Sequence, residues 1–348
     1  MQRLLTDFRV EFLDRVLEIL WRQWSALGVS GHGPNWKGSV IDPEALLAFS
    51  CTIGRHDARL FDAIVEWVQL NERFINVQRA KRIIKDESFK GKAVFGAAAA
   101  TAATSVHAGK WGGVTDLSNK KHKKAEALFY FEDGSALPIV KDADPRFREY
   151  GFLRDRFEPR GVARSFRPEP PSNLQLRLRA LLGVNARCEI LLYLLLNDEG
   201  SPRAMGRDCY YFPATMTKAL AEMRQSGYVI SRVEGRHRYY RLFPETWKKL
   251  LLQSEKKPRW IVWPRLFSAL EHIWLFLNQE GLDSKESLVQ ASSLRRILIR
   301  SVVPKLNRCG LPLVFGGESA HLGESLLPFF VGRVRDVLSD LEHLGGIR

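Results

Sequence analysis

The sequence has few cysteines and no long apolar run. Its four cysteines, Cys51, Cys188, Cys209 and Cys309, lie far apart and form no CxxC pair. That spacing argues against a disulfide framework and against a structural zinc site. We interpret the cysteines as small buried apolar residues of a protein from a reducing compartment. The apolar run from Ile190 to Leu196 is far too short to cross a bilayer.

The amino terminus also lacks the features of a targeting segment. It is apolar at helical spacing, but charged residues interrupt it at Arg3, Asp7, Arg9, Glu11, Asp14, Arg15 and Glu18. A signal peptide and a membrane span both need an uninterrupted apolar run. We therefore expect a soluble, cytoplasmic protein with no membrane partner.

The common catalytic motifs are missing as well. The sequence contains no HExxH, no GxSxG, no P-loop and no GxGxxG after a strand, and its eight histidines are scattered. The glycine pairs in GKWGG and FGGES have no phosphate-loop residues beside them. Acidic pairs on helices are explained by salt bridges along a helix face. We expect a protein that is not an enzyme and that has neither a cofactor nor a metal site.

The sequence is instead long, with many apolar residues and a large positive net charge. It has 348 residues, of which 45% are hydrophobic, and a formal net charge of +14. This length predicts two or three domains with packed cores. The positive charge favours a polyanionic partner, either a nucleic acid or an acidic protein surface.

Helical patterns dominate residues 1–92, which we predict as an N-terminal helical domain. An amphipathic helix should run from residue 1 to Gly28. Three shorter helices should follow: the first has Asp42 as its N-cap, the second starts at His56-Asp57, and the third is capped by Asn76. The last of these helices is basic and contains Arg79, Lys81, Arg82 and Lys85. These cations belong either to a degenerate helix-turn-helix or to a solvated face of a helical bundle, and we favour the bundle.

The composition changes between residues 93 and 170. The stretch from Val94 to Lys124 is rich in Ala, Gly, Thr and Lys and predicts a flexible or weakly helical connector. Its KKHKK cluster is interpreted as a solvated charge run, with contact to phosphate as the alternative. ALFYFEDGSALPIV, residues 127–140, predicts a β-hairpin. The arm that follows carries Arg146, Arg148, Arg154, Arg156, Arg160, Arg164 and Arg167. It either tracks phosphates or packs against the protein's own helices.

Residues 253–348 return to helical patterns and predict a C-terminal helical domain. The first helix carries an apolar stripe made of Trp263, Phe267, Leu270, Trp274 and Leu277. A second helix should begin at a cap near Ser284, and LPFFVGRVRDVLSDLEHLG should form the last. The stripe predicts that this face of the helix is buried in a core. As an alternative role, the C-terminal domain could form a dimer interface.

Two packed helices are predicted at the start of residues 171–252. The ranges 174–182 and 186–196 have helical apolar patterns, with Gly183 at the break and Asn185 as the cap of the second helix. Together they supply an apolar scaffold for the more polar segment that follows.

A helix-turn-helix pattern comes next. A short helix over residues 201–208 leads into a turn at Tyr210-Tyr211, and Pro213 can open a second helix that ends at Gly227. The inward side of that second helix should hold Ala214, Leu220 and Met223. Its outward side should hold Thr215, Thr217, Lys218, Glu222 and Gln225.

A two-stranded hairpin with a basic tip completes this region. YVISRVEG alternates as a strand and turns at Glu234-Gly235, and RHRYYRLF returns with Arg236, His237 and Arg238 at the tip. Residues 201–260 hold thirteen Lys and Arg against five Asp and Glu, a net charge of +8 out of +14. Basic residues at a hairpin tip are suited to reach phosphate or an adjacent minor groove.

Residues 173–252 resemble the bacterial winged-helix regulators of the arsenical-resistance and multiple-antibiotic-resistance types. RALLGVNARCEILLYLLL is similar to their opening helices, SPRAMGRDCYYFPATMTKALAEMRQSGYV to their helix-turn-helix and SRVEGRHRYYRL to their wing. The resemblance implies sequence-specific binding of double-stranded DNA, often by a dimer and often as a repressor. Metal-sensing members use cysteine pairs or His/Asp clusters. No such sensor is carried over, because Cys209 stands alone and Cys188 lies in a core-like stretch.

The layout of the whole chain is also similar to bacterial accessory proteins encoded beside abortive-infection nucleotidyltransferase toxins. That similarity implies an antitoxin-like, defence-associated regulator whose protein partner is a toxin or a defence effector. The alternative function is therefore a protein-interaction subunit that uses a winged helix as a docking scaffold.

The sequence thus predicts a mainly α, multidomain protein with a central winged helix-turn-helix over residues 171–252, flanked by helical domains at 1–92 and 253–348 and by a linker, hairpin and arm at 93–170. The expected function is sequence-specific transcriptional regulation, of the repressor type and with autoregulation of its own operon, by a homodimer on double-stranded DNA. The expected recognition-helix contacts are Thr215, Thr217, Lys218, Arg224 and Gln225. The expected wing contacts are Arg232, Arg236, His237 and Arg238.

Overall fold

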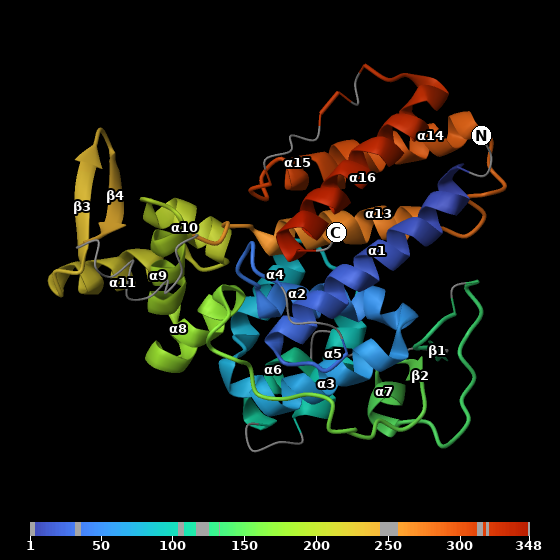
Figure 1. Ribbon diagram of the computed structural model, residues 1–348, viewed down its shortest axis with the longest axis horizontal. Helices are drawn as coiled ribbons and strands as arrows, with labels where there is room; N and C mark the ends of the chain where they lie inside the picture. Colours follow the sequence, from blue (N-terminus) through green and yellow to red (C-terminus); the bar gives the residue numbers. More distant parts are fainter. Residues whose placement is uncertain are drawn as a thin grey trace.

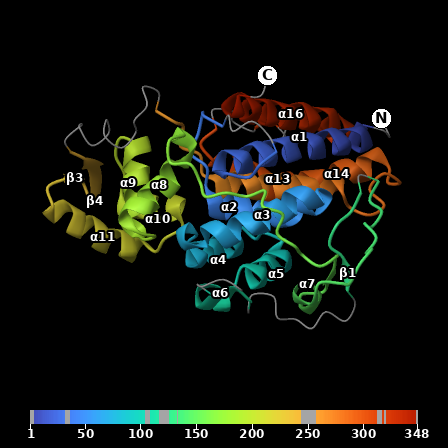
Figure 2. The same cartoon turned by 60° about the horizontal axis from the view of Figure 1, so that its bottom comes forward.

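The structure, a computed structural model, covers most of the chain. The described residues are 4–31, 36–103, 108–115, 125–131, 133–243, 257–311, 316–317 and 320–346. Within them the chain is mainly helical, as predicted, with two small two-stranded sheets. The predicted KKHKK cluster lies outside the described residues. Two parts are distinguished below: the body (residues 4–173 and 257–346) and the small unit (residues 174–242), which projects from one end of the body in Figures 1 and 2.

Two helix pairs hold the body together. Helix α1 (Leu4–Leu27) packs along α16 (Leu326–Gly345), and α2 (Pro43–Ile53) packs against α13 (Trp263–Leu277). Both views place the first and last helices of the chain side by side (Figures 1 and 2). Their buried side chains belong to a single hydrophobic cluster. The segments predicted as separate N-terminal and C-terminal domains therefore share one core in the structure.

The remaining helices of the body surround these pairs. They are α3 (Ala58–Asn71), α4 (Val77–Asp86), α5 (Lys92–Ala102), α6 (Ala108–Thr115), α7 (Pro145–Glu149), α14 (Ser287–Ile297) and α15 (Val303–Leu306), with 3-10 turns at Gly54–His56, Glu72–Phe74, Pro171–Asn173 and Gly323–Ser325 and a π-helical turn at Leu298–Val302. The predicted N-caps Asp42 and Asn76 each accept a backbone N–H from three residues further on, and so does Asp57 at the predicted start of α3. Ser284 does not cap α14, because its hydroxyl donates to the carbonyl of Gly281 at 2.9 Å.

Both predicted apolar stripes of the body are buried. On α1 these are Leu5, Phe8, Phe12, Val16, Ile19, Leu20 and Trp24, and on α13 Trp263, Phe267, Leu270, Trp274 and Leu277. The helical periodicity of the sequence therefore identified the core faces correctly. None of the described helices combines the length and the apolar content that crossing a bilayer would require.

The stretch after Val94, predicted as a flexible or weakly helical connector, forms two packed helices in its first part, α5 and α6. Helix α5 buries Val94, Phe95 and most of its alanines. In α6 the indole of Trp111 is fully buried and donates to Glu72 at 3.0 Å. Alanine has the highest helix propensity, and a helix that is apolar all round is stable only when neighbours cover it. Such a helix has no polar face, so periodicity does not reveal it.

The hairpin predicted for residues 127–140 forms only in part. The chain reverses at Gly134, and Tyr130 and Ala136 form one antiparallel bridge. Strand β1 (Glu126–Ala127) pairs in parallel with β2 (Phe152–Leu153), which lies beyond α7. A parallel partner needs a crossover connection, and local turn signals cannot predict that pairing.

The arginine-rich arm packs in part against the body's own helices. Arg154 is 5% exposed, and its Nη1 lies 2.5 Å from Oδ1 of Asp62 on α3. Its guanidinium also contacts the rings of Phe129 and Phe147, at 5.1 Å from each centroid. Arg154 therefore packs against the protein's own helices, which is the second of the two roles predicted for this arm.

Asp144, the N-cap of α7, should make the free energy of unfolding depend on pH in the acidic range. Its buried carboxylate accepts bonds from the Arg146 guanidinium and from the backbone N–H groups of Arg146 and Phe157. Burial alone would raise the pKa of Asp144, but these bonds outweigh it and lower the pKa to about 2. The carboxylate therefore contributes about 2 kcal/mol above pH ~4, and this is lost as the pH falls towards 2.

An Asp144→Asn variant should accordingly lose about 2 kcal/mol of unfolding free energy near neutral pH. The difference from the wild-type chain should shrink between about pH 4 and pH 2, where the carboxylate becomes protonated. Urea denaturation at several pH values measures both quantities. A difference that stays constant over this range would contradict the assignment.

The small unit is a four-helix and hairpin assembly with its own core. Its elements are α8 (Leu174–Leu182), α9 (Ala186–Leu196), α10 (Pro202–Cys209), α11 (Pro213–Gln225), β3 (Val229–Glu234) and β4 (His237–Leu242). Their buried side chains form a second hydrophobic cluster that includes Met205, Met216 and Leu220. In Figure 1 the β3–β4 hairpin lies at the end of the molecule farthest from the body's α14. The element order agrees with the order predicted for this region.

Candidate nucleic-acid interface

The helices of the small unit begin and end where local chemistry favours it. Asn185 caps α9, as predicted, and Ser201 at the predicted start of α10 caps that helix, each by accepting a backbone N–H. Pro213 occupies the first turn of α11, where its missing N–H costs little. Gly227 follows the end of α11 with a φ of 77°, which is the left-handed conformation that glycine tolerates best.

A tight turn joins α10 to α11. Tyr210 adopts a left-handed conformation (φ 59°, ψ 47°), and the N–H of Tyr211 donates to the carbonyl of Gly206 at 2.9 Å. A Cβ atom at Gly206 would lie only 2.9 Å from the carbonyl oxygen of Tyr211. Glycine is therefore needed at this position for the two helices to approach so closely.

Helix α11 buries one face and leaves the opposite face open. Met216, Ala219 and Leu220 are buried. All the predicted contact residues of this helix lie on its exposed surface: Thr215, Thr217, Lys218, Arg224 and Gln225. Ala214, predicted to face inward, is exposed, because Met216 takes that place in the apolar stripe.

The β3–β4 hairpin presents the predicted basic tip. The strands pair from Val229 with Leu242 to Glu234 with His237, which leaves Gly235 and Arg236 as the turn. Gly200, just before α10, forms an antiparallel bridge with Tyr240 and so ties the hairpin to the helices. The side chains of Arg236, His237 and Arg238 are exposed.

Arg232 differs from the other predicted wing residues because its charge is engaged within the chain. Its Nη2 lies 2.6 Å from Glu199, and its Nη1 contacts Glu234. The guanidinium also lies over the ring of Tyr239. These carboxylates raise the pKa of Arg232 above its ordinary value. Arg232 therefore links the two strands of the hairpin to Glu199, which precedes α10.

A groove of about 1150 Å³, here called the basic groove, opens between α10, α11, the hairpin and the body. Its charged lining residues are Arg82, Asp86, Glu87, Arg203, Arg207, Arg236, Arg238 and Arg265. Six arginines against two carboxylates give a net charge of +4, with His237 counted as neutral. Arg203, Arg236 and Arg238 are exposed and form no ion pair with any described residue. The groove thus offers positive charge that the described residues leave uncompensated.

The groove gathers only some of the predicted contact residues. Thr217 of α11 lines it together with the hairpin-tip residues Arg236, His237 and Arg238. Thr215, Lys218, Arg224 and Gln225 do not line it and lie on the rest of the exposed surface of α11. Sequence reasoning missed Arg203 and Arg207, although their i, i+4 spacing on α10 already placed them on one helix face.

The turn between α10 and α11 is fastened to α4 of the body. The amide of Asn76 donates to the hydroxyl of Tyr211 at 2.6 Å, and the hydroxyl of Tyr210 donates to Glu87 at 2.5 Å. The guanidinium carbon of Arg82 lies 4.2 Å from the centroid of the Phe212 ring. The start of α11 is therefore held at a fixed distance from the body.

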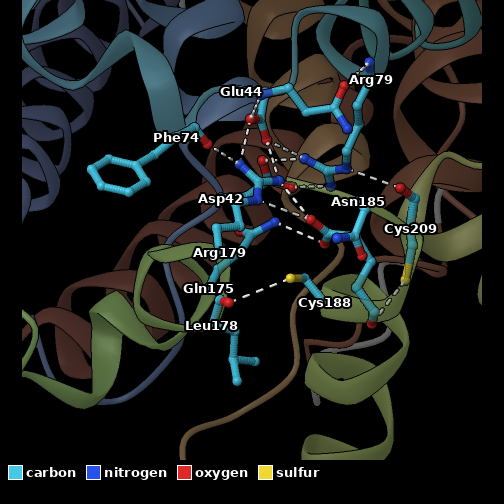
Figure 3. A network of polar contacts seen from close by, with 12 residues as sticks. Asp42, Glu44, Phe74, Arg79, Gln175, Leu178, Arg179, Asn185, Cys188 and Cys209 are labelled. Carbon is cyan, nitrogen blue, oxygen red and sulfur yellow. Dashed lines mark hydrogen bonds and ion pairs between the residues drawn. The ribbon is translucent and has the colours of Figure 1, made fainter. Parts of the chain in front are cut away.

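A buried ionic network lies behind this turn and joins the small unit to the body (Figure 3). Arg179 of α8 contacts Glu44 of α2 at 2.5 Å and Glu189 of α9 at 2.6 Å. Arg79 of α4 contacts Glu44 at 2.6 Å and Asp42 at 2.5 Å. Figure 3 shows that these side chains converge from both parts of the molecule, with Glu44 between the two arginines.

The network keeps its members charged in spite of burial. Burial opposes the charged form of Asp42, but the adjacent Arg79 outweighs it and lowers the pKa of Asp42. Burial likewise opposes the charge of Arg179, yet Glu44 and Glu189 raise its pKa above the ordinary value. A buried pair of this kind is costly to break, because removing one partner leaves an uncompensated charge.

The network overturns one of the predictions for α4. Arg79 was assigned to a solvated face or to a helix-turn-helix surface, but its side chain is 4% exposed. Its Nε also donates to the carbonyl of Cys209 at the end of α10, at 2.9 Å. Lys81 and Arg82 are half-buried and Lys85 is exposed, so the solvated-face interpretation holds only for part of this helix.

The cysteines behave as the sequence predicted. All four are free and buried: Cys51, Cys188, Cys209 and Cys309. Burial raises the pKa of the Cys188 thiol to about 11. Nowhere in the described part of the chain do three or more His, Cys, Asp or Glu side chains gather as a metal site would require. No protein-family model matches this chain, and no curated protein or solved structure matches it either.

Proposed function

We propose that this chain binds double-stranded DNA sequence-specifically, through a winged helix-turn-helix formed by α8–α11 and the β3–β4 hairpin, and acts as a transcriptional regulator of the repressor type. The observation that carries the proposal is the basic groove, whose uncompensated arginines lie beside the exposed face of α11. A polyanion is the partner that such a surface fits best, because it supplies the missing negative charge.

The two exposed elements would have different roles on a duplex. In a helix-turn-helix the second helix enters the major groove, so the exposed side chains of α11 would meet base edges and phosphates there. Gln225 can form paired hydrogen bonds with adenine, while Lys218 and the threonines mainly fix the register on the backbone. Arg236 and Arg238 at the hairpin tip would contact phosphate or the adjacent minor groove.

A gel shift of the purified full-length chain on its own upstream region tests the proposal. We expect a shifted complex at about 50 mM salt that survives an excess of unrelated competitor duplex, because specific sites bind about 10³-fold or more tightly than unrelated ones. Two chains per duplex would support the homodimer. Absence of any shift at this salt concentration would reject DNA binding.

A second candidate function is that of an antitoxin-like or defence-associated subunit that binds another protein. The observation that favours it is the set of exposed apolar side chains on and beside the hairpin: Tyr228 (50%), Val233 (65%) and Phe243 (53%). Phosphate contacts make no use of apolar groups, whereas protein interfaces do. A failed gel shift combined with binding to an acidic protein partner would favour this candidate.

A further inference from the structure

One wall of the basic groove belongs to the body and not to the small unit. Arg82 and Asp86 of α4 and Arg265 of α13 line it, opposite the hairpin tip. Arg265 is already engaged, since its Nη1 lies 3.1 Å from Asp208. Among the described residues Arg82 has one carboxylate partner, Asp86, at 3.1 Å, in an i, i+4 pair whose side chains are 26% and 43% exposed. Such exposed pairs are weak, so the charge of Arg82 can be shared with a stronger anion.

Arg82 also lies beside the first turn of α11. Its guanidinium rests on the ring of Phe212, the residue just before Pro213 at the start of that helix. Among the described residues only Nε of Arg82 forms a hydrogen bond, and Nη1 is a buried atom that has no partner. The contacts of Asn76 with Tyr211 and of Glu87 with Tyr210 prevent α4 from moving away.

We infer that α4 of the body is part of the DNA-contacting surface, and that Arg82 contacts a phosphate of the strand that passes in front of the first turn of α11. The inference rests on the proposed function, and it adds a contact that the winged helix-turn-helix alone does not supply. A duplex whose major groove contacts α11 must also contact the side chain of Arg82, because Arg82 packs on Phe212 at the start of that helix. The protein should therefore contact the duplex on one flank through the body and on the other through the hairpin.

Asp86 allows a second prediction, in which a substitution raises the affinity for the duplex. Its carboxylate lines the same groove and would lie close to the bound phosphate. Neutralising it by Asp86→Asn releases Arg82 from its pair and removes a like-charge repulsion. We expect this variant to bind duplex more tightly than the wild-type chain at low salt, by roughly threefold, the effect of removing one weak competing ion pair.

The test compares the salt dependence of duplex binding, measured by fluorescence anisotropy between about 50 and 200 mM salt. Arg82→Ala should make the slope of log K against log salt shallower by about 0.9. The fall in affinity over this salt range should therefore be roughly threefold smaller in the variant than in the wild-type chain. Arg82→Lys should keep the wild-type slope, because the charge is retained. Arg59→Ala removes an equal charge from α3, which contributes no residue to the groove, and should leave the slope unchanged.

Phe212→Ala separates a charge contact from a structural role, because it removes the ring beneath Arg82 but keeps the cation. A wild-type slope for Phe212→Ala supports the inference, and a slope as shallow as that of Arg82→Ala would overturn it. An unchanged slope for Arg82→Ala would also overturn it, and the proposed function would stand if Arg236→Ala/Arg238→Ala still flattened the slope. If the hairpin-tip variant has no effect either, DNA binding at this surface fails together with the inference.

Discussion

Replacing Arg179 by methionine should lower the free energy of unfolding by about 3–5 kcal/mol, the largest stability loss expected for a single polar side chain here. The Arg179 side chain is fully buried and joins Glu44 of the body to Glu189 of the small unit. Methionine fills much of the same space but carries no charge. Glu189 would then lose the only cation paired with it among the described residues, and Glu44 would keep Arg79 alone. Urea denaturation followed by tryptophan fluorescence measures the loss.

Arg187→Met is the matched control for this variant. Arg187 also belongs to the small unit and pairs with a glutamate, Glu222, but the two side chains are 53% and 40% exposed. Exposed ion pairs contribute about 0–1 kcal/mol, so this variant should lose no more than that. Equal losses in the two variants would show that the buried network does not hold the two parts together.

Removing both hairpin-tip arginines should cause the largest loss of DNA binding. Arg236 and Arg238 are exposed, line the basic groove and pair with no described carboxylate. The double variant Arg236→Ala/Arg238→Ala should make the slope of log K against log salt shallower by about 1.8. Its affinity should be reduced on all duplexes alike, because phosphate contacts do not depend on sequence.

The arm supplies a matched control for the same experiment. Arg156 and Arg160 are exposed, and neither lines the groove. Replacing both by alanine removes the same formal charge from a segment that was predicted either to track phosphates or to pack on the body. We expect wild-type binding from this control. A loss equal to that of the hairpin variant would mean that net charge, and not the groove, determines affinity.

Features set by a few neighbouring residues could be predicted from the sequence. The N-caps at Asp42, Asn76 and Asn185 follow from short polar side chains placed before helical segments. The hairpin follows from two alternating strands on either side of Gly235, although the turn is Gly235-Arg236, one residue later than the predicted Glu234-Gly235. These signals depend on chemistry within a few residues, and the fold does not override them.

Features that depend on distant residues could not be predicted in this way. Helix α5 has no polar face because other helices surround it, so its sequence resembled a connector. Arg79 looked like a surface cation, since nothing near it in the sequence shows that Asp42 and the end of α10 enclose it. For the same reason the contribution of α4 to the basic groove appears only once the body and the small unit are packed together.

The salt dependence of duplex binding by the intact wild-type chain shows most clearly whether the basic groove binds DNA. Four cations of the groove are available to phosphates, Arg82, Arg203, Arg236 and Arg238, and Lys218 of α11 is a fifth cation beside them. Five contacts predict a slope of log K against log salt of about −4.5 for each bound chain on the protein's own upstream region, with affinity at least about 10³-fold above that for an unrelated duplex of equal length. No binding at about 50 mM salt, or a slope near zero, would contradict DNA binding through this surface.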